Sequence, residues 1–269
     1  MSKLLFGRII KVTIESDTYK GSFDYEDLEI RFEVPFDDDS KPNQSFVEIF
    51  NLTPTTINRI KKNSVITIQA GYRGDFGVIA MGRVTRTKTR REGVDKITTV
   101  HMKEGDDLSH LKADGNKKIT FKSGTNANTI INRLAGMLKI KIQSIDLPKN
   151  KVYKKGLTVS GSVENKLNEV VKDCGAAMYY RRGRLVIRSI KTGDDERFKL
   201  EEATGLIETP EQIEDEDVTG YAVKCLLQHR ITTASIIEIQ SKTAKGRYRA
   251  KRGKHYFDGS DFFTEVDVI

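Results

Sequence analysis

Hydrophobic and polar side chains alternate at a period of two along much of the first and last parts of the chain. The alternation is clear in residues 9–14, 28–34 and 46–50, and it returns in residues 235–240 and 262–269. Side chains that alternate in this way point to opposite faces of a β-strand, so that one face can be buried. Turn-rich loops separate these segments, and both end regions are therefore expected to be mostly β.

The pattern changes to a helical period in the middle of the chain. Apolar residues of segment 126–138 fall on one helical face, and a second amphipathic helix opens at Ser162 and ends at Gly175. Ser is a favoured N-cap, and Gly adopts the left-handed conformation that ends many helices. A hairpin over residues 177–188, turning at Arg182–Gly183, follows. Two helices and a few strands predict a compact α+β domain.

The predicted fold class is therefore mainly β, with an inserted α+β domain. Short strands at near-regular spacing, with one short helix capped by Thr53, indicate a small barrel or sandwich in the first region. We expect three domains, namely a first β-barrel at 1–112, the α+β domain at 113–200 and a second β-barrel at 201–269.

A weak internal sequence similarity relates the two β regions. Residues 65–69 and 236–240 are Ile-rich strands that end in Gln, and each precedes a Gly-Arg pair, at Gly82 and Gly246. A basic stretch and another strand follow in both places. Chance can produce this similarity because Gly-Arg is a common pair. The alternative is a structural duplication, with the α+β domain inserted between two related β units.

Composition narrows the class of protein. The 269 residues carry 46 basic and 38 acidic side chains, and 37% of them are hydrophobic against 31% charged, which favours several modest cores and much partner-facing surface. No uncharged apolar run approaches the roughly 18 residues of a membrane helix, and early charges at Arg8 and Lys11 argue against a secretory signal. Cys174 and Cys225 lie in apolar stretches and are expected to be buried thiols.

The sequence offers little for catalysis. It contains no nucleophile elbow, no P-loop and no dinucleotide-binding glycine motif, and its four histidines lack ligand spacing for zinc. The strongest hydrolytic candidates are carboxylates at 24–27 and 37–39, which sit in loops without a partnering histidine. We therefore predict no enzyme activity, no metal and no cofactor, and a hydrolase is the least favoured alternative.

Charge clusters suggest an interface. Residues 242–254 hold seven basic and no acidic side chains, and three basic residues alternate with threonines at 85–90. One hypothesis is a nucleic-acid surface on the 242–254 strip. The favoured one is contact between basic strands of one subunit and the acidic loop 208–217 of the next, with the turn at 73–77 as a further contact. The candidate contact residues are Arg73, Asp75, Phe76, Arg86, Lys88, Arg90, Glu214, Asp215, Glu216, Asp217, Arg247, Arg249 and Lys251.

Edge strands supply the physical reason for an assembly. A polar β unit with long alternating strands exposes unpaired backbone N–H and C=O groups, which closure or a neighbour must satisfy. Two such units in one chain would gain from joining copies of the same chain into a closed ring.

Specific segments carry a resemblance to a known family. Residues 47–54, 66–75 and 77–84 are similar to the first domain of phage tail baseplate hub proteins, and residues 246–266 are similar to their last domain. The resemblance is strongest over 45–105 and 204–269. It rests on a pattern of strands and glycines.

The resemblance implies two tail-tube-like β-barrels flanking an inserted α+β domain, a plan also used by type VI secretion spikes. It implies a homotrimer whose two barrels per chain form a pseudo-sixfold ring, joining the tail tube or a distal tail ring to a spike or tail fibre. DNA would pass transiently through the central channel. The protein would belong to the virion, be made in the bacterial cytoplasm and insert into no membrane, and any cell-wall cleavage would come from another chain.

Overall fold

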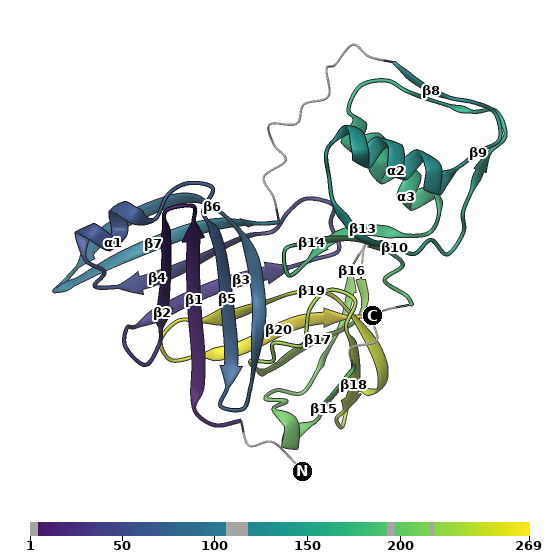
Figure 1. Cartoon of the computed structure of the whole chain (residues 1–269). Helices are drawn as coiled ribbons and strands as arrows, with labels where there is room; N and C mark the ends of the chain where they lie inside the picture. Colours follow the sequence, from purple (N-terminus) through teal and green to yellow (C-terminus); the bar gives the residue numbers. More distant parts are fainter. Residues whose placement is uncertain (1–4, 106–117, 193–196, 216–217) are drawn as a thin grey trace.

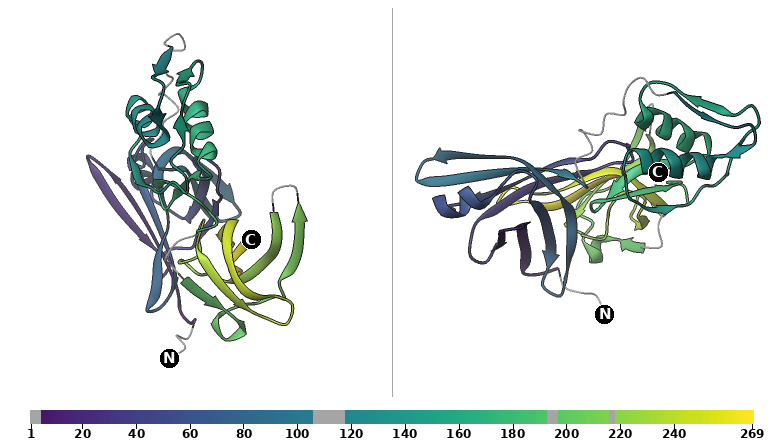
Figure 2. Two further views of the ribbon diagram at one scale, coloured as in Figure 1. Left: turned by 90° about the vertical axis from the view of Figure 1, so that its right-hand side faces the viewer. Right: turned by 45° about the horizontal axis from the view of Figure 1, so that its top comes forward.

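A computed structural model describes residues 5–105, 118–192, 197–215 and 218–269. Two β regions form the lower part of the molecule in Figure 1, and a separate α+β unit lies above them. The left view of Figure 2 shows this unit extending from one end of the β regions. The mainly β fold with an inserted α+β unit agrees with the predicted fold class.

The first β region is a curved antiparallel sheet in the order β3-β4-β7-β6-β5-β1-β2. Its inward side chains, such as Ile14, Ile49 and Ile68, are fully buried. The strands are β1 (Arg8–Ser16), β2 (Tyr19–Asp24), β3 (Ile30–Phe36), β4 (Gln44–Phe50), β5 (Val65–Tyr72), β6 (Asp75–Glu92) and β7 (Asp95–Glu104).

The helix α1 (Pro54–Arg59) links β4 to β5. The hydroxyl Oγ1 of Thr53 accepts a hydrogen bond from the Thr56 backbone N–H at 3.2 Å, and Pro54 stands at the start of the helix. The sequence predicts both features. Thr is a favoured N-cap, and proline suits the first helical position because it has no N–H that would need a partner there. Ile57 and Ile60 face the core of the first region.

The second β region contains the strands at the C-terminal end of the chain. They run antiparallel in the order β16-β17-β20-β19, with β18 also paired to β19 and β15 to β18. The elements are β15 (Arg197–Leu200), the 3-10 helix η1 (Glu202–Thr204), β16 (Glu211–Asp215), β17 (Val218–Leu226), β18 (Ile236–Gln240), β19 (Lys245–Phe257) and β20 (Phe262–Val268).

The two β regions share one sheet. The last part of β19, Gly253–Phe257, pairs antiparallel with β3 over Phe32–Phe36. Side chains cross the junction in both directions, because Phe257 and Phe262 complete the core of the first region and Phe36 belongs to that of the second. The described residues thus form one continuous sheet of 13 strands rather than two separately closed ones.

The two β regions also repeat one strand arrangement. We call β3-β4-β7-β6-β5 the first repeat and β16-β17-β20-β19-β18 the second; their strands follow each other in the same chain order. In both, the long strand has a β-bulge, next to Val84 in β6 and next to Ala250 in β19. Directly after the bulge, one row of paired residues crosses four strands of each repeat. The rows are Arg86, His101, Phe46 and Glu33 in the first repeat and Arg252, Asp267, Ala222 and Glu211 in the second.

The internal sequence similarity therefore reflects a structural repeat. The alignment of the two repeats differs, however, from the one that the two Gly-Arg pairs suggest. Ile66 pairs with Gly82 in the first repeat, whereas its equivalent Ile237 pairs with Tyr248. Gly82 thus corresponds to Tyr248 and not to Gly246. The strand pairing determines this correspondence, whereas matching the two Gly-Arg pairs of the sequence gives a different alignment.

The α+β unit has its own core. Helices α2 (Ala127–Met137) and α3 (Val163–Asp173) begin at N-caps Asn126 and Ser162 and bury one apolar face each. They pack on the sheet β10-β14-β13. The strands are β8 (Ile119–Phe121), β9 (Thr125–Asn126), β10 (Ile142–Ile145), β11 (Val152–Tyr153), β12 (Leu157–Val159), β13 (Ala177–Arg181) and β14 (Arg184–Arg188).

Candidate interaction surfaces

The predicted basic residues of the first repeat lie on the outer half of β6. Beyond the bulge, Arg86, Lys88 and Arg90 alternate with threonines and share one face of the strand. Arg86 Nη2 lies 3.1 Å from His101 Nε2, and Arg90 Nη1 donates to Glu48 Oε1 at 2.6 Å. Burial, together with the positive charge of Arg86, lowers the pKa of His101. Arg86, Lys88 and Arg90 therefore carry the positive charge of this face without a contribution from a protonated His101.

This half of β6 is also a strand edge. On one side it pairs with β7, but on the other side the pairing with β5 ends at Arg83. Among the described residues no strand pairs with Arg86–Glu92 on that side. Figure 1 shows the β6–β7 hairpin reaching away from the rest of the sheet. Unpaired backbone groups on such an edge can accept a further strand. We call residues Arg86–Arg91 the β6 edge.

The predicted acidic loop is partly a strand. Residues 211–215 form β16 and pair antiparallel with β17, and Glu211 and Glu214 are exposed. This corrects the prediction of a loop over 208–217. Only Ile213 and Gln212 interrupt the acidic residues, so no alternation marks the strand, and its pairing with β17 determines the structure. Asp215 ends β16, and Glu216 and Asp217 lie outside the described residues.

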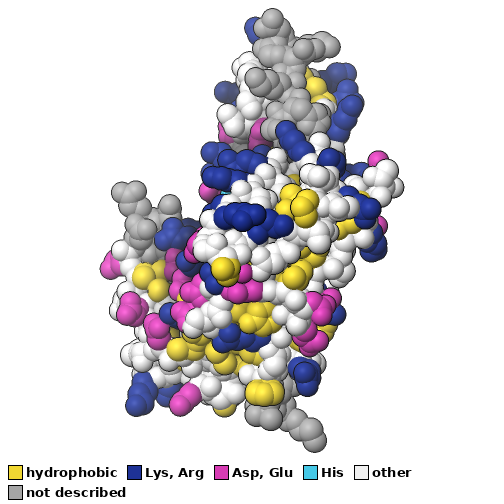
Figure 3. Space-filling model, turned by 90° about the vertical axis from the view of Figure 1, so that its left-hand side faces the viewer, with side chains coloured by type: hydrophobic (Ala, Val, Ile, Leu, Met, Phe, Trp, Pro, Cys, Tyr) yellow, Lys and Arg dark blue, Asp and Glu magenta, His cyan; other side chains and the backbone are white. Residues whose placement is uncertain are grey.

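β16 lies at one end of the sheet order, whose other end is β2. It pairs only with β17 within the part of the chain that the structure describes, so its outer side is a second open edge. One open edge is thus basic, and the other carries Glu211 and Glu214. Figure 3 views the molecule from the side of the β6–β7 hairpin, where Lys and Arg side chains gather across the middle and acidic and hydrophobic side chains lie below.

The basic residues of β19 keep to the outer face through its bulge. Arg247 and Arg249 precede the bulge at Lys251, and Arg252 and Lys254 follow it, while Ala250 and His255 point inward. Burial and the neighbouring arginines Arg247 and Arg197 lower the pKa of Arg249. The bulge shifts the alternation by one residue and so keeps the charged side chains together.

Acidic residues neutralise part of this basic strip. Arg252 Nε donates to Asp267 Oδ2 at 2.7 Å, and Lys254 Nζ lies 3.8 Å from Glu33 Oε2 and 3.6 Å from Glu265 Oε2. These carboxylates compete with phosphate for the same cations, which weakens the nucleic-acid hypothesis.

The turn at 73–77 joins the two β regions within the chain. Asp75 accepts hydrogen bonds from both terminal nitrogens of Arg230, at 2.8 and 2.5 Å, and its side chain is only 9% exposed. Arg73 and Phe76 are exposed, and Phe76 pairs with Gly71 at the start of β6. Asp75 is therefore occupied inside the chain, whereas Arg73 and Phe76 face outward.

A buried carboxylate connects the first repeat to the α+β unit. Glu104 accepts hydrogen bonds from Asn43 Nδ2 at 2.9 Å and from the Gly183 backbone N–H at 2.8 Å. Burial raises its pKa. Sequence analysis missed this contact and the Asp75–Arg230 pair, because their members lie far apart in the chain and no local pattern marks them.

The candidate hydrolytic carboxylates do not form a catalytic arrangement. Asp24 lies 3.1 Å from Lys11 Nζ in an ion pair. Asp37 Oδ1 accepts the Asp39 backbone N–H at 3.0 Å, and burial raises the pKa of Asp37. A metal site needs several converging ligands, and the described residues contain no group of three or more candidate ligands. Asp24 thus serves an ion pair, and Asp37 serves a local turn.

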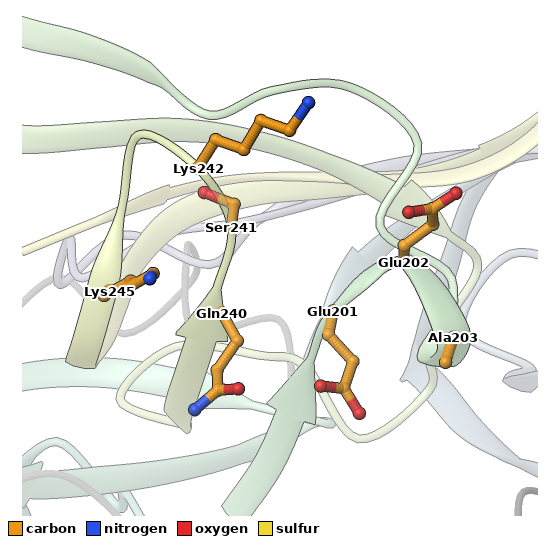
Figure 4. A pocket seen from close by; sticks show the side chains of 7 residues that line it. All are labelled: Glu201, Glu202, Ala203, Gln240, Ser241, Lys242 and Lys245. Carbon is orange, nitrogen blue, oxygen red and sulfur yellow. The ribbon is translucent and has the colours of Figure 1, made fainter.

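An open hollow lies between the β15–η1 segment and the β18–β19 turn. It measures about 680 Å³ and is open to solvent. Figure 4 shows Glu201 and Glu202 on one side and Lys242 and Lys245 on the other. Lys199 Nζ lies 2.8 Å from Glu201 Oε2. The seven lining residues provide no nucleophile with a general base beside it, so the hollow is a charged surface depression. The other three residues that line the hollow are Ala203, Gln240 and Ser241.

Comparison with known proteins relates the fold to tail structures. No protein-family model matches the sequence, and no curated protein sequence is similar to it. A 43 kDa tail protein of prophage MuSo2 from Shewanella oneidensis matches 97% of this chain over 97% of its own length, with a TM-score of 0.67 and 9% identity. A tail protein from Neisseria meningitidis matches 98% of this chain over 96% of its own, with a TM-score of 0.67 and 8% identity.

A third solved structure extends the similarity to secretion systems. It is an Escherichia coli protein described as a component of the type VI secretion system with structural similarity to the T4 bacteriophage tail proteins gp27 and gp5. It covers 96% of this chain and 76% of its own, with a TM-score of 0.65 and 8% identity. The resemblance predicted from residues 45–105 and 204–269 is thus confirmed at the level of the fold.

Proposed function

We propose that this chain is the structural baseplate hub of a bacteriophage or phage-derived tail. Three copies form a pseudo-sixfold ring that joins the tail tube, or a distal tail ring, to a central spike or fibre. DNA passes through the channel at its centre. The role is structural and involves no catalysis. The chain works in the virion after synthesis in the bacterial cytoplasm.

The internal repeat carries the proposal. The two repeats are joined edge to edge through β19 and β3, so that one chain already presents two equivalent units side by side. Three such chains supply six equivalent units to a sixfold tube, while the single α+β unit of each chain retains threefold symmetry toward a spike. The shared fold of tail proteins and of a type VI secretion component supports the same plan.

We propose the division 1–112, 113–200 and 201–269 for the three parts of each subunit. The main core of the middle part supports it, since this core lies within residues 127–187. A smaller cluster, in which Tyr179 and Val186 meet Ala234, joins the middle part to the second β region. No helix in the described part of the chain is long and apolar enough to cross a membrane.

Microscopy of intact particles tests the proposal. Tails labelled with a gold-conjugated antibody against this chain should carry the label at the end of the tail tube, where the spike or fibre attaches. Label along the tube, on the capsid or on no particle would overturn the proposal. Salt-sensitive DNA binding by a single copy, without any assembly, would favour the nucleic-acid hypothesis instead.

A further inference from the structure

The junction between the two repeats shows how this fold joins one unit to the next. Five residue pairs connect β19 to β3, from Gly253 opposite Phe36 to Phe257 opposite Phe32. The junction combines backbone pairing with charge, because Lys254 Nζ of β19 lies 3.8 Å from Glu33 Oε2 of β3. A lysine of the long strand thus lies near a glutamate of the first strand across the junction.

The same long strand in the first repeat lacks such a neighbour. By the rows described above, the β6 edge corresponds to Arg252–Phe257 of β19, and Lys88 corresponds to Lys254. β3 pairs with one side of β19. The equivalent side of β6 has no pairing strand among the described residues. Equivalent contacts confirm the register, since Thr89 hydrogen-bonds to Thr98 and the equivalent His255 hydrogen-bonds to Thr264.

The strand equivalent to β3 is β16. Glu33 stands opposite Phe46 in the row of the first repeat, and Glu211 stands opposite Ala222 in the row of the second. Glu211 therefore corresponds to Glu33. β3 is occupied by β19, whereas the outer side of β16 meets no other strand among the described residues. The β6 edge and the outer side of β16 thus correspond to the two sides of the β19–β3 junction.

We propose that the β6 edge of one copy pairs antiparallel with β16 of a second copy, in the register of the β19–β3 junction. Arg90 then stands opposite Glu211 of the second copy, and Lys88 stands opposite Ile213. Lys88 and Glu211 form the ion pair that Lys254 and Glu33 form within the chain. This inference rests on the proposed function and names the strands through which the ring closes.

Physical chemistry favours this pairing over a contact of like edges. Strand addition satisfies both rows of backbone groups at once, and alternating side chains then determine specificity. Two β6 edges would bring Arg86, Lys88 and Arg90 against their own copies, and like charges directly opposite are destabilising. A contact between two different edges is head to tail, so each copy uses both edges and a ring can close.

Cross-linking tests the register. A full-length variant with Lys88→Cys and Ile213→Cys places two thiols directly opposite each other across the junction, while the native Cys174 and Cys225 are buried. Mild oxidation should produce covalent dimers and trimers on non-reducing gels. The control combines Lys88→Cys with Gln240→Cys on β18 and should remain a single chain. Equal cross-linking of both variants would overturn the inference.

A double-mutant cycle tests the ion pair. Lys88→Gln and Glu211→Gln should each raise the concentration needed for assembly about tenfold, and the double variant should raise it by clearly less than the product of the two single effects. Lys122→Glu, an exposed lysine of the α+β unit, should leave assembly unchanged. Single effects that simply multiply in the double variant would overturn the pairing.

The outcomes separate the two levels of the proposal. Native mass measurement of the unmodified chain gives the number of copies independently of the cysteine and charge variants. If three copies assemble but the register pair does not cross-link, the edge assignment is wrong and the proposed hub stands. If the unmodified chain forms no ring under any condition, the proposed hub fails and the edge assignment fails with it.

Discussion

Asn63 and Ala234 occupy the same position in the two repeats. Each has a left-handed backbone, with φ of 69° and 67°, and each N–H donates to the long strand beside its bulge, to Val84 O and Ala250 O. Ser64 and Ser235 follow them and accept the return hydrogen bonds. Two non-glycine residues in this uncommon conformation, at equivalent points, show that the repeat extends to the details of the backbone.

The left-handed conformation predicts how these positions respond to substitution. Asn63→Gly and Ala234→Gly should change the free energy of unfolding by no more than about 1 kcal/mol, because glycine adopts positive φ without strain. Asn63→Val and Ala234→Val should each lower it by at least about 2 kcal/mol, since a β-branched side chain resists this backbone. Urea denaturation measures all four. Full tolerance of valine at both positions would contradict the assignment.

His255 makes the junction between the repeats sensitive to acid. It is fully buried beside Phe36, its Nδ1 lies 2.8 Å from Thr264 Oγ1, and burial lowers its pKa to about 3. Below a pH of about 6.5 the unfolded chain binds a proton that the native chain excludes, so stability falls as the pH falls toward 3.

At pH 5 this histidine should cost about 2 kcal/mol of the free energy of unfolding relative to pH 7. Denaturation of the full chain at the two pH values should show that loss, and His255→Gln should lack it. His101→Gln should remove a smaller part of the loss, because burial also lowers the pKa of His101 but at a more exposed site. An NMR titration that protonates His255 near pH 6.5 in the folded chain would refute the prediction without any variant.

The pair Asp75 and Arg230 should hold the two β regions together. Asp75→Ala leaves a partly buried guanidinium without its carboxylate and should lower the free energy of unfolding by about 2 kcal/mol. A double-mutant cycle with Arg230→Ala should give a coupling energy above about 1 kcal/mol. Simple additivity of the two substitutions would show that the contact contributes no specific stability.

The local elements follow from the sequence, but their long-range partners do not. Period-two alternation identifies β1, β5 and β18, the helical period over 126–138 identifies α2, and Ser162 marks the start of α3, because these signals are local. β16 escapes detection because its acidic residues do not alternate with apolar ones. The repeat was faint because α1 in one copy is replaced in the other by residues 227–235, without helix.

The candidate contact residues show the same division. Charge patterning identifies Arg86, Lys88, Arg90 and Glu214, which the fold places near two open strand edges. It also selects Asp75, whose partner Arg230 is 155 residues away and cannot be inferred from local pattern. Glu211, the acidic residue that the register assigns to the junction, is singled out only when both repeats are aligned by their strand pairing.

The mass of the assembled species tests the central claim most directly. Native mass spectrometry of the full-length chain over a wide concentration range should show one discrete three-copy species that gains population with concentration. Negative-stain images of that species should show a ring with a central opening. A single folded copy at every concentration, also after mixing with purified tail tubes, would contradict the account.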